Sequence, residues 1–124
     1  MKKLGWFLLA VFFMYACDDI IEVEDISERT VTLVAPTDGA ILSSGTINFD
    51  WESVEDAESY RIQIATPNFE LPLQIVADST LADSTATNTT FSINLNAGAY
   101  QWRVRAQNSD YHTNYTTQSF TVED

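Results

Sequence analysis

A strict alternation of apolar and polar residues, in the segment GAYQWRVRAQN at 98–108, most constrains what this chain can fold into. Successive side chains of a β-strand point to opposite faces, so one face here carries Tyr100, Trp102, Val104 and Ala106. A helix would need apolar residues three and four positions apart, and the aromatic and β-branched residues also favour a pleated strand. The segment therefore predicts a half-buried antiparallel strand.

Short alternating runs of the same kind continue from residue 30 onward, separated by Gly, Pro, Asn, Asp and Ser, and no helix-length periodicity competes with them. The predicted strands are Val31–Ala35, Thr46–Trp51, Tyr60–Ala65, Leu73–Ala77, Thr90–Leu95, Ala99–Ala106 and Gln118–Val122. Seven strands in about 95 residues are typical of an all-β, seven-stranded immunoglobulin-like sandwich.

The core of this sandwich follows from the same alternation. The side chains expected to face inward are Ile47, Phe49, Trp51, Tyr60, Ile62, Ile64, Phe91, Ile93, Leu95, Tyr100, Trp102, Val104, Ala106, Phe120 and Val122. A single cysteine excludes an intramolecular disulfide, so the domain must rest on its apolar core. Burying one such side chain is worth about 1.5–3 kcal/mol, which makes a disulfide-free sandwich of this length plausible.

The segment APTDGAILSSGTINFDWESVEDAESYRIQIA resembles the first half of a fibronectin type III domain. The matching positions are Pro36, Trp51, Val54, Ala57 and Tyr60. In that family they are the proline of the first strand, the tryptophan of the second, two residues of the next loop and the tyrosine that opens the third strand. The likeness covers residues 30–124 and implies the immunoglobulin-like fold.

A second segment, LNAGAYQWRVRAQN, resembles the sixth-strand region of the same family. Leu95, Gly98 and Tyr100 fit a tyrosine corner, in which the phenol hydroxyl bonds back to upstream backbone.

The first residues, MKKLGWFLLAVFFMYACDD, have the layout of a secretory signal: two lysines, an apolar run, a small residue and then Cys17. Thirteen apolar residues at about 1.5 Å each span about 20 Å, short of a roughly 30 Å hydrocarbon core, so a transmembrane anchor fits less well. The cysteine after Met14 and Ala16 resembles a bacterial lipobox, which implies cleavage and lipid attachment at Cys17. We therefore predict a signal peptide at 1–16 and a membrane-bound terminus.

The charge of the chain limits its partners. The formal net charge is −12, and loss of Lys2 and Lys3 with the signal peptide would leave four arginines against eighteen acids, or −14. Nucleic acid is therefore excluded as a partner, because it requires a basic patch. Residues 17–29 are predicted to be the lipidated cysteine and an acidic tether, ahead of a domain at 30–124. Acids directly after a lipidated cysteine resemble the export signal of surface lipoproteins in Bacteroidota, which implies the outer membrane.

The residues needed for catalysis are scarce. The chain has one histidine, His112, and its one cysteine is assigned to lipid, which excludes a nucleophilic triad and a His and Cys metal site. Four scattered glycines form no phosphate-binding loop. We expect no cofactor, no metal and no enzymatic activity. Acids around Glu55 could bind a hard cation, but a solvated charged loop explains them as well.

Two loops at one end of the sandwich form the first candidate binding site. The residues expected there are Glu55, Asp56, Glu58, Tyr111, His112 and Tyr115. Aromatic rings beside acids resemble sugar-binding surfaces, and loops at a sandwich end also commonly bind proteins. The alternative is that the tyrosines only pack on or extend from their own loop.

Two further sets of residues have both a functional and a structural interpretation. Arg61, Arg103 and Arg105 are expected on one outer sheet face, as a carboxylate or sulfate site or as a ladder of cross-strand charge pairs. Ser79 and Ser84 lie in a Ser/Thr-rich stretch predicted to be a loop, and both resemble the O-glycosylation tripeptide of Bacteroidota.

The sequence thus predicts a lipid-anchored protein of the cell envelope with one fibronectin type III-like domain. Its expected role is that of a non-catalytic binding or adaptor module whose partner is another envelope protein. The alternative is a carbohydrate-binding accessory lipoprotein.

Overall fold

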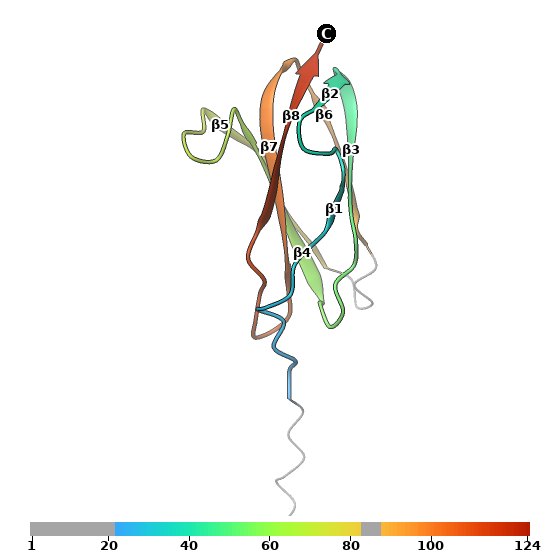
Figure 1. The fold of residues 1–124 in the computed structure, drawn as a ribbon, viewed down its shortest axis with the longest axis vertical. Coiled ribbons are helices and arrows are strands. Elements are labelled where there is room, and N and C mark those ends of the chain that lie inside the picture. Colours follow the sequence, from blue (N-terminus) through green and yellow to red (C-terminus); the bar gives the residue numbers. More distant parts are fainter. Residues whose placement is uncertain (1–21, 83–87) are drawn as a thin grey trace, which may run out of the picture.

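The computed structural model describes residues 22–82 and 88–124 (Figure 1). The predicted signal peptide, Cys17 and Ser84 lie outside the described residues. The strands are β1 (Leu33–Ala35), β2 (Ala40–Ser43), β3 (Gly45–Trp51), β4 (Ser59–Thr66), β5 (Gln74–Ala82), β6 (Thr90–Leu95), β7 (Gly98–Gln107) and β8 (Thr116–Glu123). All regular elements within the described ranges are strands, as the sequence predicts. Neither range contains a helix long and apolar enough to cross a membrane.

The strands form two sheets. The three-stranded sheet has the order β1-β3-β6, and the five-stranded sheet has the order β2-β8-β7-β4-β5 (Figure 1). Neighbouring strands are antiparallel except β2 and β8, which run parallel. Rings from β3 and β7 meet between the sheets, Phe49 lying 5.0 Å from Trp102, so the two sheets form a sandwich.

The number of strands corrects the sequence prediction: the described residues contain eight strands, not seven. The chain leaves the first sheet after β1 and joins the second as β2. Pro36 has no N–H for a sheet, and Gly39 has a φ of 82°, which favours glycine. The Gly39 N–H then donates to Ser119 O at 2.7 Å, and Ala40 pairs with Phe120. Four residues, AILS, were too few to predict a strand without their partner.

The fourth predicted strand, Leu73–Ala77, also differs from the observed element. Strand β5 starts at Gln74 and continues to Ala82, through residues that were predicted to be a loop. Asp78 pairs with Gln63 and Ser79 with Ile62 across the β4–β5 ladder. The Ser- and Thr-rich composition favoured a loop, but pairing with a long neighbouring strand extends β5.

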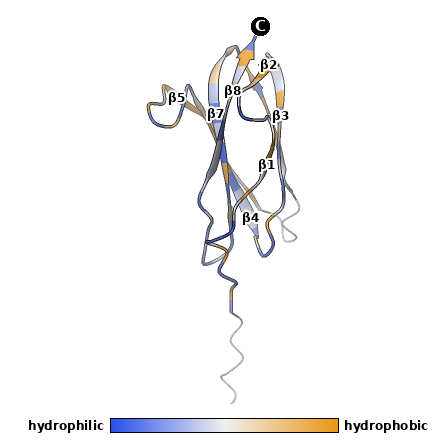
Figure 2. Ribbon diagram, viewed as in Figure 1, coloured by the Kyte–Doolittle hydropathy of each residue, from blue (hydrophilic) through white to orange (hydrophobic). Residues whose placement is uncertain are grey.

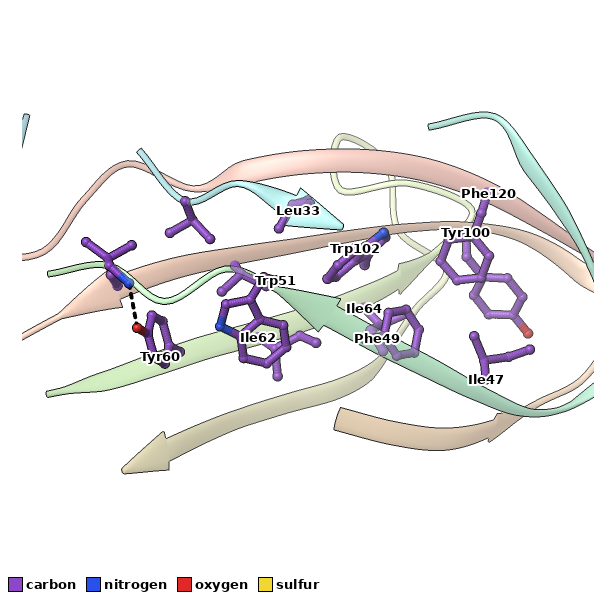
Figure 3. Packing of buried hydrophobic residues seen from close by; sticks show 14 of the residues in the cluster. Leu33, Ile47, Phe49, Trp51, Tyr60, Ile62, Ile64, Tyr100, Trp102 and Phe120 are labelled. Carbon is purple, nitrogen blue, oxygen red and sulfur yellow. Dashed lines mark hydrogen bonds between the residues drawn. The ribbon is translucent and has the colours of Figure 1, made fainter. Parts of the chain in front are cut away.

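The expected core forms most of the observed core, which also contains Ile26, Val31, Leu33, Val54 and Ala57. The expected inward residues are buried, except that Phe91 and Ile93 are partly buried and pack against the cluster. In Figure 2, hydrophobic positions interrupt otherwise hydrophilic strands, as a half-buried strand requires. Phe49 contacts Trp102 at 5.0 Å and Phe120 at 5.7 Å between ring centroids (Figure 3). Trp102 Nε1 donates to Pro36 O at 3.2 Å, which satisfies the buried indole.

Two tyrosines connect the core to the loops. The Tyr100 hydroxyl donates to Asn96 O at 2.8 Å, which is the tyrosine corner predicted from the sequence. The Tyr60 hydroxyl accepts a hydrogen bond from Val54 N at 2.8 Å (Figure 3), and this bond holds the β3–β4 loop to β4. Buried tyrosines therefore anchor one turn at each end of the sandwich, Tyr100 the β6–β7 turn and Tyr60 the β3–β4 loop.

The packed core extends further towards the N-terminus than the expected domain boundary at residue 30. Ile26 has no exposed surface and belongs to the core cluster, although it falls in the predicted acidic tether. Nothing in the sequence indicates that Ile26 is buried, because no apolar alternation surrounds it. Its burial follows from packing against the core. Residues from Ile26 onward therefore belong to the folded domain.

Candidate functional site

The structure brings together the two loops that the sequence analysis singled out. We call this region the loop end and define it as residues 52–58, between β3 and β4, and residues 108–114, which follow β7. The Glu58 N–H donates to Gln107 O at 2.8 Å. The side-chain amide of Asn108 reaches Asp56 O at 3.5 Å. The loop end is thus one connected surface.

The N-terminal segment packs against the loop end. Arg29 donates to Asp56 Oδ2 at 3.0 Å and also to the backbone carbonyl of Glu55. The Asn108 side chain donates to Glu24 O at 2.9 Å. Asp56 has a φ of 67°, uncommon for a residue other than glycine, and the bond from Arg29 helps to hold it there. Residues 24–29 therefore occupy part of the surface that was expected to receive a ligand.

The candidate residues of the loop end do not all lie together. Glu55, Asp56, Glu58, Tyr111 and His112 are exposed there, and Nδ1 of the histidine lies 3.0 Å from Thr113 O. The remaining candidate, Tyr115, directly precedes β8 and lies elsewhere: its ring is 4.4 Å from the Arg103 guanidinium, on the outer face of the five-stranded sheet.

One cavity opens at the loop end and one near β1. The first has a volume of about 370 Å³ and is lined by Glu22, Val23, Glu24, Asp56, Ala57, Glu58 and Asn108. Among the residues that the structure describes, no group of three His, Cys, Asp or Glu side chains could hold a metal ion. The second has a volume of about 300 Å³ and is lined by Ala35, Pro36, Leu42, Ser43, Thr46, Ile47 and Asn48, none of them titratable.

The second candidate region lies on the outside of the five-stranded sheet. Arg61 pairs directly with Arg105, and Gln63 with Arg103, in the β4–β7 ladder, so the three arginines share one face. We call this region the arginine face and define it by Arg61, Arg103, Arg105, Phe69 and Tyr115. The expectation that the three arginines lie together on an outer face agrees with the register.

Arg61 is paired within the protein. It donates to both carboxylate oxygens of Asp78, at 2.9 and 2.8 Å, and Gln63 donates to the same carboxylate at 3.1 Å. The bonds from Arg61 lower the pKa of the Asp78 carboxyl, and the carboxylate in turn raises the pKa of Arg61. The structural interpretation of the three arginines was that they form cross-strand charge pairs. Arg61 forms such a pair with Asp78.

Arg103 and Arg105 are arranged differently. The Arg103 guanidinium lies 4.0 Å from the Phe69 ring and 4.4 Å from the Tyr115 ring, and its Nε donates to Gln63 at 2.8 Å. Arg105 lies 5.1 Å from the same tyrosine ring. Within residues 22–82 and 88–124, neither arginine has a carboxylate oxygen within 4.0 Å. Stacking on rings fixes these charges without neutralising them.

A loop with exposed leucines adjoins the arginine face. We call residues 67–73, between β4 and β5, the leucine hairpin, because Leu71 and Leu73 are 80% and 88% exposed. Hydrogen bonds hold this loop: the Phe69 N–H donates to Gln101 Oε1 at 3.0 Å, and the Leu73 N–H donates to Thr66 O at 2.8 Å. Figure 1 shows the loop before β5 standing out from the side of the sandwich.

Sequence reasoning missed the leucine hairpin, the contribution of Phe69 and Tyr115 to the arginine face, and Asp78 as the partner of Arg61. The leucine hairpin has a signal in the sequence, because PNFELPL places three apolar residues among two prolines, an asparagine and one acid, where a turn would be polar. Stacking of Phe69 and Tyr115 on one arginine has no such signal, because the three residues belong to separate parts of the chain.

Comparison with known proteins identifies the fold. No protein-family model and no curated protein sequence matches this chain. Solved structures do match, and they include fibronectin type III domains. The sandwich described above therefore has a fibronectin type III-like fold.

Three of these structures show how far the likeness extends. An engineered protein has a TM-score of 0.57 at 17% identity, over 77% of this chain and 20% of its own. The fibronectin(III)-like modules of Clostridium thermocellum CbhA have a TM-score of 0.53 at 18% identity, over 76% of this chain and 46% of theirs. A fibronectin type III domain of human KIAA0970 protein has a TM-score of 0.52 at 15% identity, over 74% and 72%. The chain thus spans less than half of the first two structures, and the likeness concerns the fold.

Proposed function

We propose that this protein is a non-catalytic binding or adaptor lipoprotein of the bacterial cell envelope. In this proposal Cys17 carries the lipid that holds the protein at the outer membrane, and the fibronectin type III-like domain binds another protein. The acids after Cys17 resemble the export signal of surface lipoproteins in Bacteroidota, so we assign the protein to that group.

The observation that carries the binding role is the leucine hairpin. Leu71 and Leu73 are almost fully exposed on a loop whose backbone is hydrogen bonded to the sandwich. Soluble domains seldom display apolar side chains side by side on an ordered loop, and where they do the patch commonly marks an interaction site.

Support for a non-catalytic role comes from the environment of the polar side chains. His112 contacts a backbone carbonyl, and Arg61 and Asp78 satisfy each other across two strands. Such pairs stabilise a sheet, whereas a catalytic base needs a reacting group within hydrogen-bond reach. Asp78 is therefore assigned a structural role.

A carbohydrate-binding role remains the second proposal, and one observation favours it. Tyr111 is 37% exposed at the loop end, which also carries Glu55 and Glu58, and an exposed ring beside carboxylates can stack on a sugar. Because Tyr115 lies on the arginine face, a glycan would meet one ring at the loop end.

The experiment that tests the proposal is affinity purification of the tagged full chain from crosslinked membranes of its native host, with mass spectrometry. A reproducible, near-stoichiometric envelope protein that is lost on Leu71→Ser/Leu73→Ser supports the adaptor role. A glycan array probed with the same protein tests the second role, and binding lost on Tyr111→Ala supports it.

The anchor needs a separate test. The Cys17→Ser variant is expected to move from the membrane fraction to the soluble fraction and to lose incorporation of labelled palmitate. A Cys17→Ser protein that still sediments with membranes would remove lipid anchoring from the proposal.

A further inference from the structure

We infer that the leucine hairpin and the unpaired arginines of the arginine face form one docking surface for a partner protein segment that carries carboxylates next to apolar side chains. This inference rests on the proposed binding function and names the surface and the chemistry of its partner. The inference builds on the carboxylate site that the sequence analysis offered for the three arginines, and the loop end, its first candidate site, has no part in it.

The charge distribution points to a carboxylate-bearing partner. Beyond the predicted signal peptide the sequence has four basic side chains, all arginines, against eighteen acids. Arg29 is paired with Asp56 at the loop end, and Arg61 is paired with Asp78. Within the described residues Arg103 and Arg105 form no such ion pair. Gln63 bonds both Arg103 and Asp78, and the Arg61 bonds, with help from the Arg103 charge, lower the pKa of Asp78. In so acidic a chain, two neighbouring cations that form no ion pair are complementary to an acidic partner.

The two guanidinium groups are also held ready for binding. Arg103 lies between the rings of Phe69 and Tyr115 and uses its Nε for Gln63. Arg105 uses its Nε for Gln107 at 3.2 Å. Among residues 22–82 and 88–124 no hydrogen bond uses the terminal nitrogens of either guanidinium, so these nitrogens can meet an external acceptor. A planar guanidinium fixed by stacking loses little freedom on binding and matches the two oxygens of a carboxylate.

The leucine hairpin supplies the apolar half of the same surface. Phe69 belongs to both regions: its ring stacks on Arg103, and its backbone lies two residues before Leu71. The loop is fixed by its bonds to Gln101 and Thr66, so the exposed leucines are presented on a rigid support. Preformed apolar anchors beside charged groups are the usual composition of an interface centre and its rim.

This combination favours a protein over other occupants. Leucines do not offer the flat aromatic face on which sugars stack, so a glycan would leave the leucine hairpin unused. An anionic membrane would be repelled by a chain with so many acids. A second copy of this chain would bring together two strongly negative molecules, whereas a short acidic segment need bring only the carboxylates that meet Arg103 and Arg105. An acidic protein segment with apolar side chains uses both halves of the surface.

The test is selection of a random peptide library on the detergent-solubilised full chain, followed by fluorescence anisotropy with the enriched peptides. The enriched peptides are expected to combine Asp or Glu with Leu, Ile, Val, Phe or Met. Leu71→Ser/Leu73→Ser and Arg103→Gln/Arg105→Gln should each weaken binding by about tenfold or more, and rising salt should weaken binding to the wild type.

Two matched controls accompany these variants. Ile41→Ser removes another exposed apolar side chain, 66% exposed on β2, and Arg29→Gln removes an arginine that is paired within the protein. Both are expected to bind the peptides within about twofold of the wild type. A urea unfolding curve of every variant shows whether a loss of binding reflects unfolding, and a variant that unfolds is replaced by the milder Leu73→Thr or Arg105→Lys.

Four outcomes overturn the inference. They are enriched peptides without acidic residues, peptides whose binding survives both double substitutions, a library from which nothing is enriched, and a dimer that becomes monomeric on Leu71→Ser/Leu73→Ser. If peptide binding is lost on Tyr111→Ala instead, the binding function stands and the docking surface is wrong. If affinity purification and the glycan array also give no partner, the proposed function fails as well.

Discussion

The loop end and the arginine face both carry arginines, and they use them in opposite ways. At the loop end Arg29 is paired within the protein, because it donates hydrogen bonds to the Asp56 carboxylate and to the carbonyl of Glu55. On the arginine face Arg103 is fixed by two aromatic rings and a glutamine, which position the cation and leave it charged. The comparison teaches that fixing a charge and neutralising it are separate operations, and that only the first leaves a group able to bind an external ligand.

The two regions also lie at different distances from the N-terminal segment. The described chain starts beside the loop end, and the C-terminus lies at the opposite end of the sandwich (Figure 1). If Cys17 is anchored as proposed, the loop end would lie on the membrane side of the domain. The leucine hairpin follows the far end of β4, from Thr66 onward, and would lie further from the membrane.

The largest expected effect concerns the packing of the N-terminal segment on the domain. Ile26→Ala should lower the free energy of unfolding by about 2–4 kcal/mol, because it removes a fully buried side chain from the core. Urea unfolding of the full chain measures this, with Val34→Ala, at a half-exposed position, as the control. Equal stability of the two variants would mean that this segment is a loose tether after all.

The next effect tests whether the core supports the loop end. Tyr60→Phe leaves the Val54 N–H without its hydroxyl acceptor and should cost about 1–3 kcal/mol. Tyr111→Phe, at an exposed position of the same end, should change the unfolding midpoint little. A Tyr60→Phe protein as stable as the Tyr111→Phe control would show that this bond does not hold the loop.

A direct comparison of two arginines follows. Arg29→Gln should lower the free energy of unfolding by about 0.5–1.5 kcal/mol, because it removes bonds between the N-terminal segment and the β3–β4 loop. Arg105→Gln should stay within about 0.5 kcal/mol of the wild type. Thermal unfolding of both variants in one buffer measures the difference. If Arg105→Gln is the less stable variant, the division of roles between the two regions is wrong.

The smallest effect is a pH dependence on the arginine face. Because the Arg61 bonds lower the folded-state pKa of Asp78, the pair stabilises the fold above the ordinary carboxyl pKa of about 4. That contribution is lost as the pH falls through the lowered value. Asp78→Asn should therefore melt about 1–3 °C lower than the wild type at neutral pH. The two proteins should melt together in strong acid, and a constant difference at every pH would refute this origin.

The fold was largely predictable because its signals are local. Alternation along Thr46–Trp51 and Ala99–Ala106 predicted both the strands and their buried faces, and the resemblance to fibronectin type III domains implied the hydrogen bond of Tyr100. Strand β2 and the second half of β5 were missed, since each is a strand only because another strand lies beside it.

The candidate site was less predictable, for a related reason. The sequence placed Arg103 and Arg105 on one outer face by period two, and the ladder with β4 agrees. It placed Tyr115 in a binding loop, whereas the ring stacks on those arginines. The direction of a side chain at the end of a loop depends on where the next strand begins, and that is set by pairing with β7.

The sequence by itself determined the all-β character of this protein, the identity of its core and its acidity, because hydrophobic periodicity and charge are properties of neighbouring residues along one chain. Tertiary structure alone decided that Ile26 belongs to the core, that Asp78 neutralises Arg61, and that Phe69 and Tyr115 hold Arg103. These are contacts between residues distant in sequence. Their energies depend on the register and packing of the sheets, which no local pattern encodes.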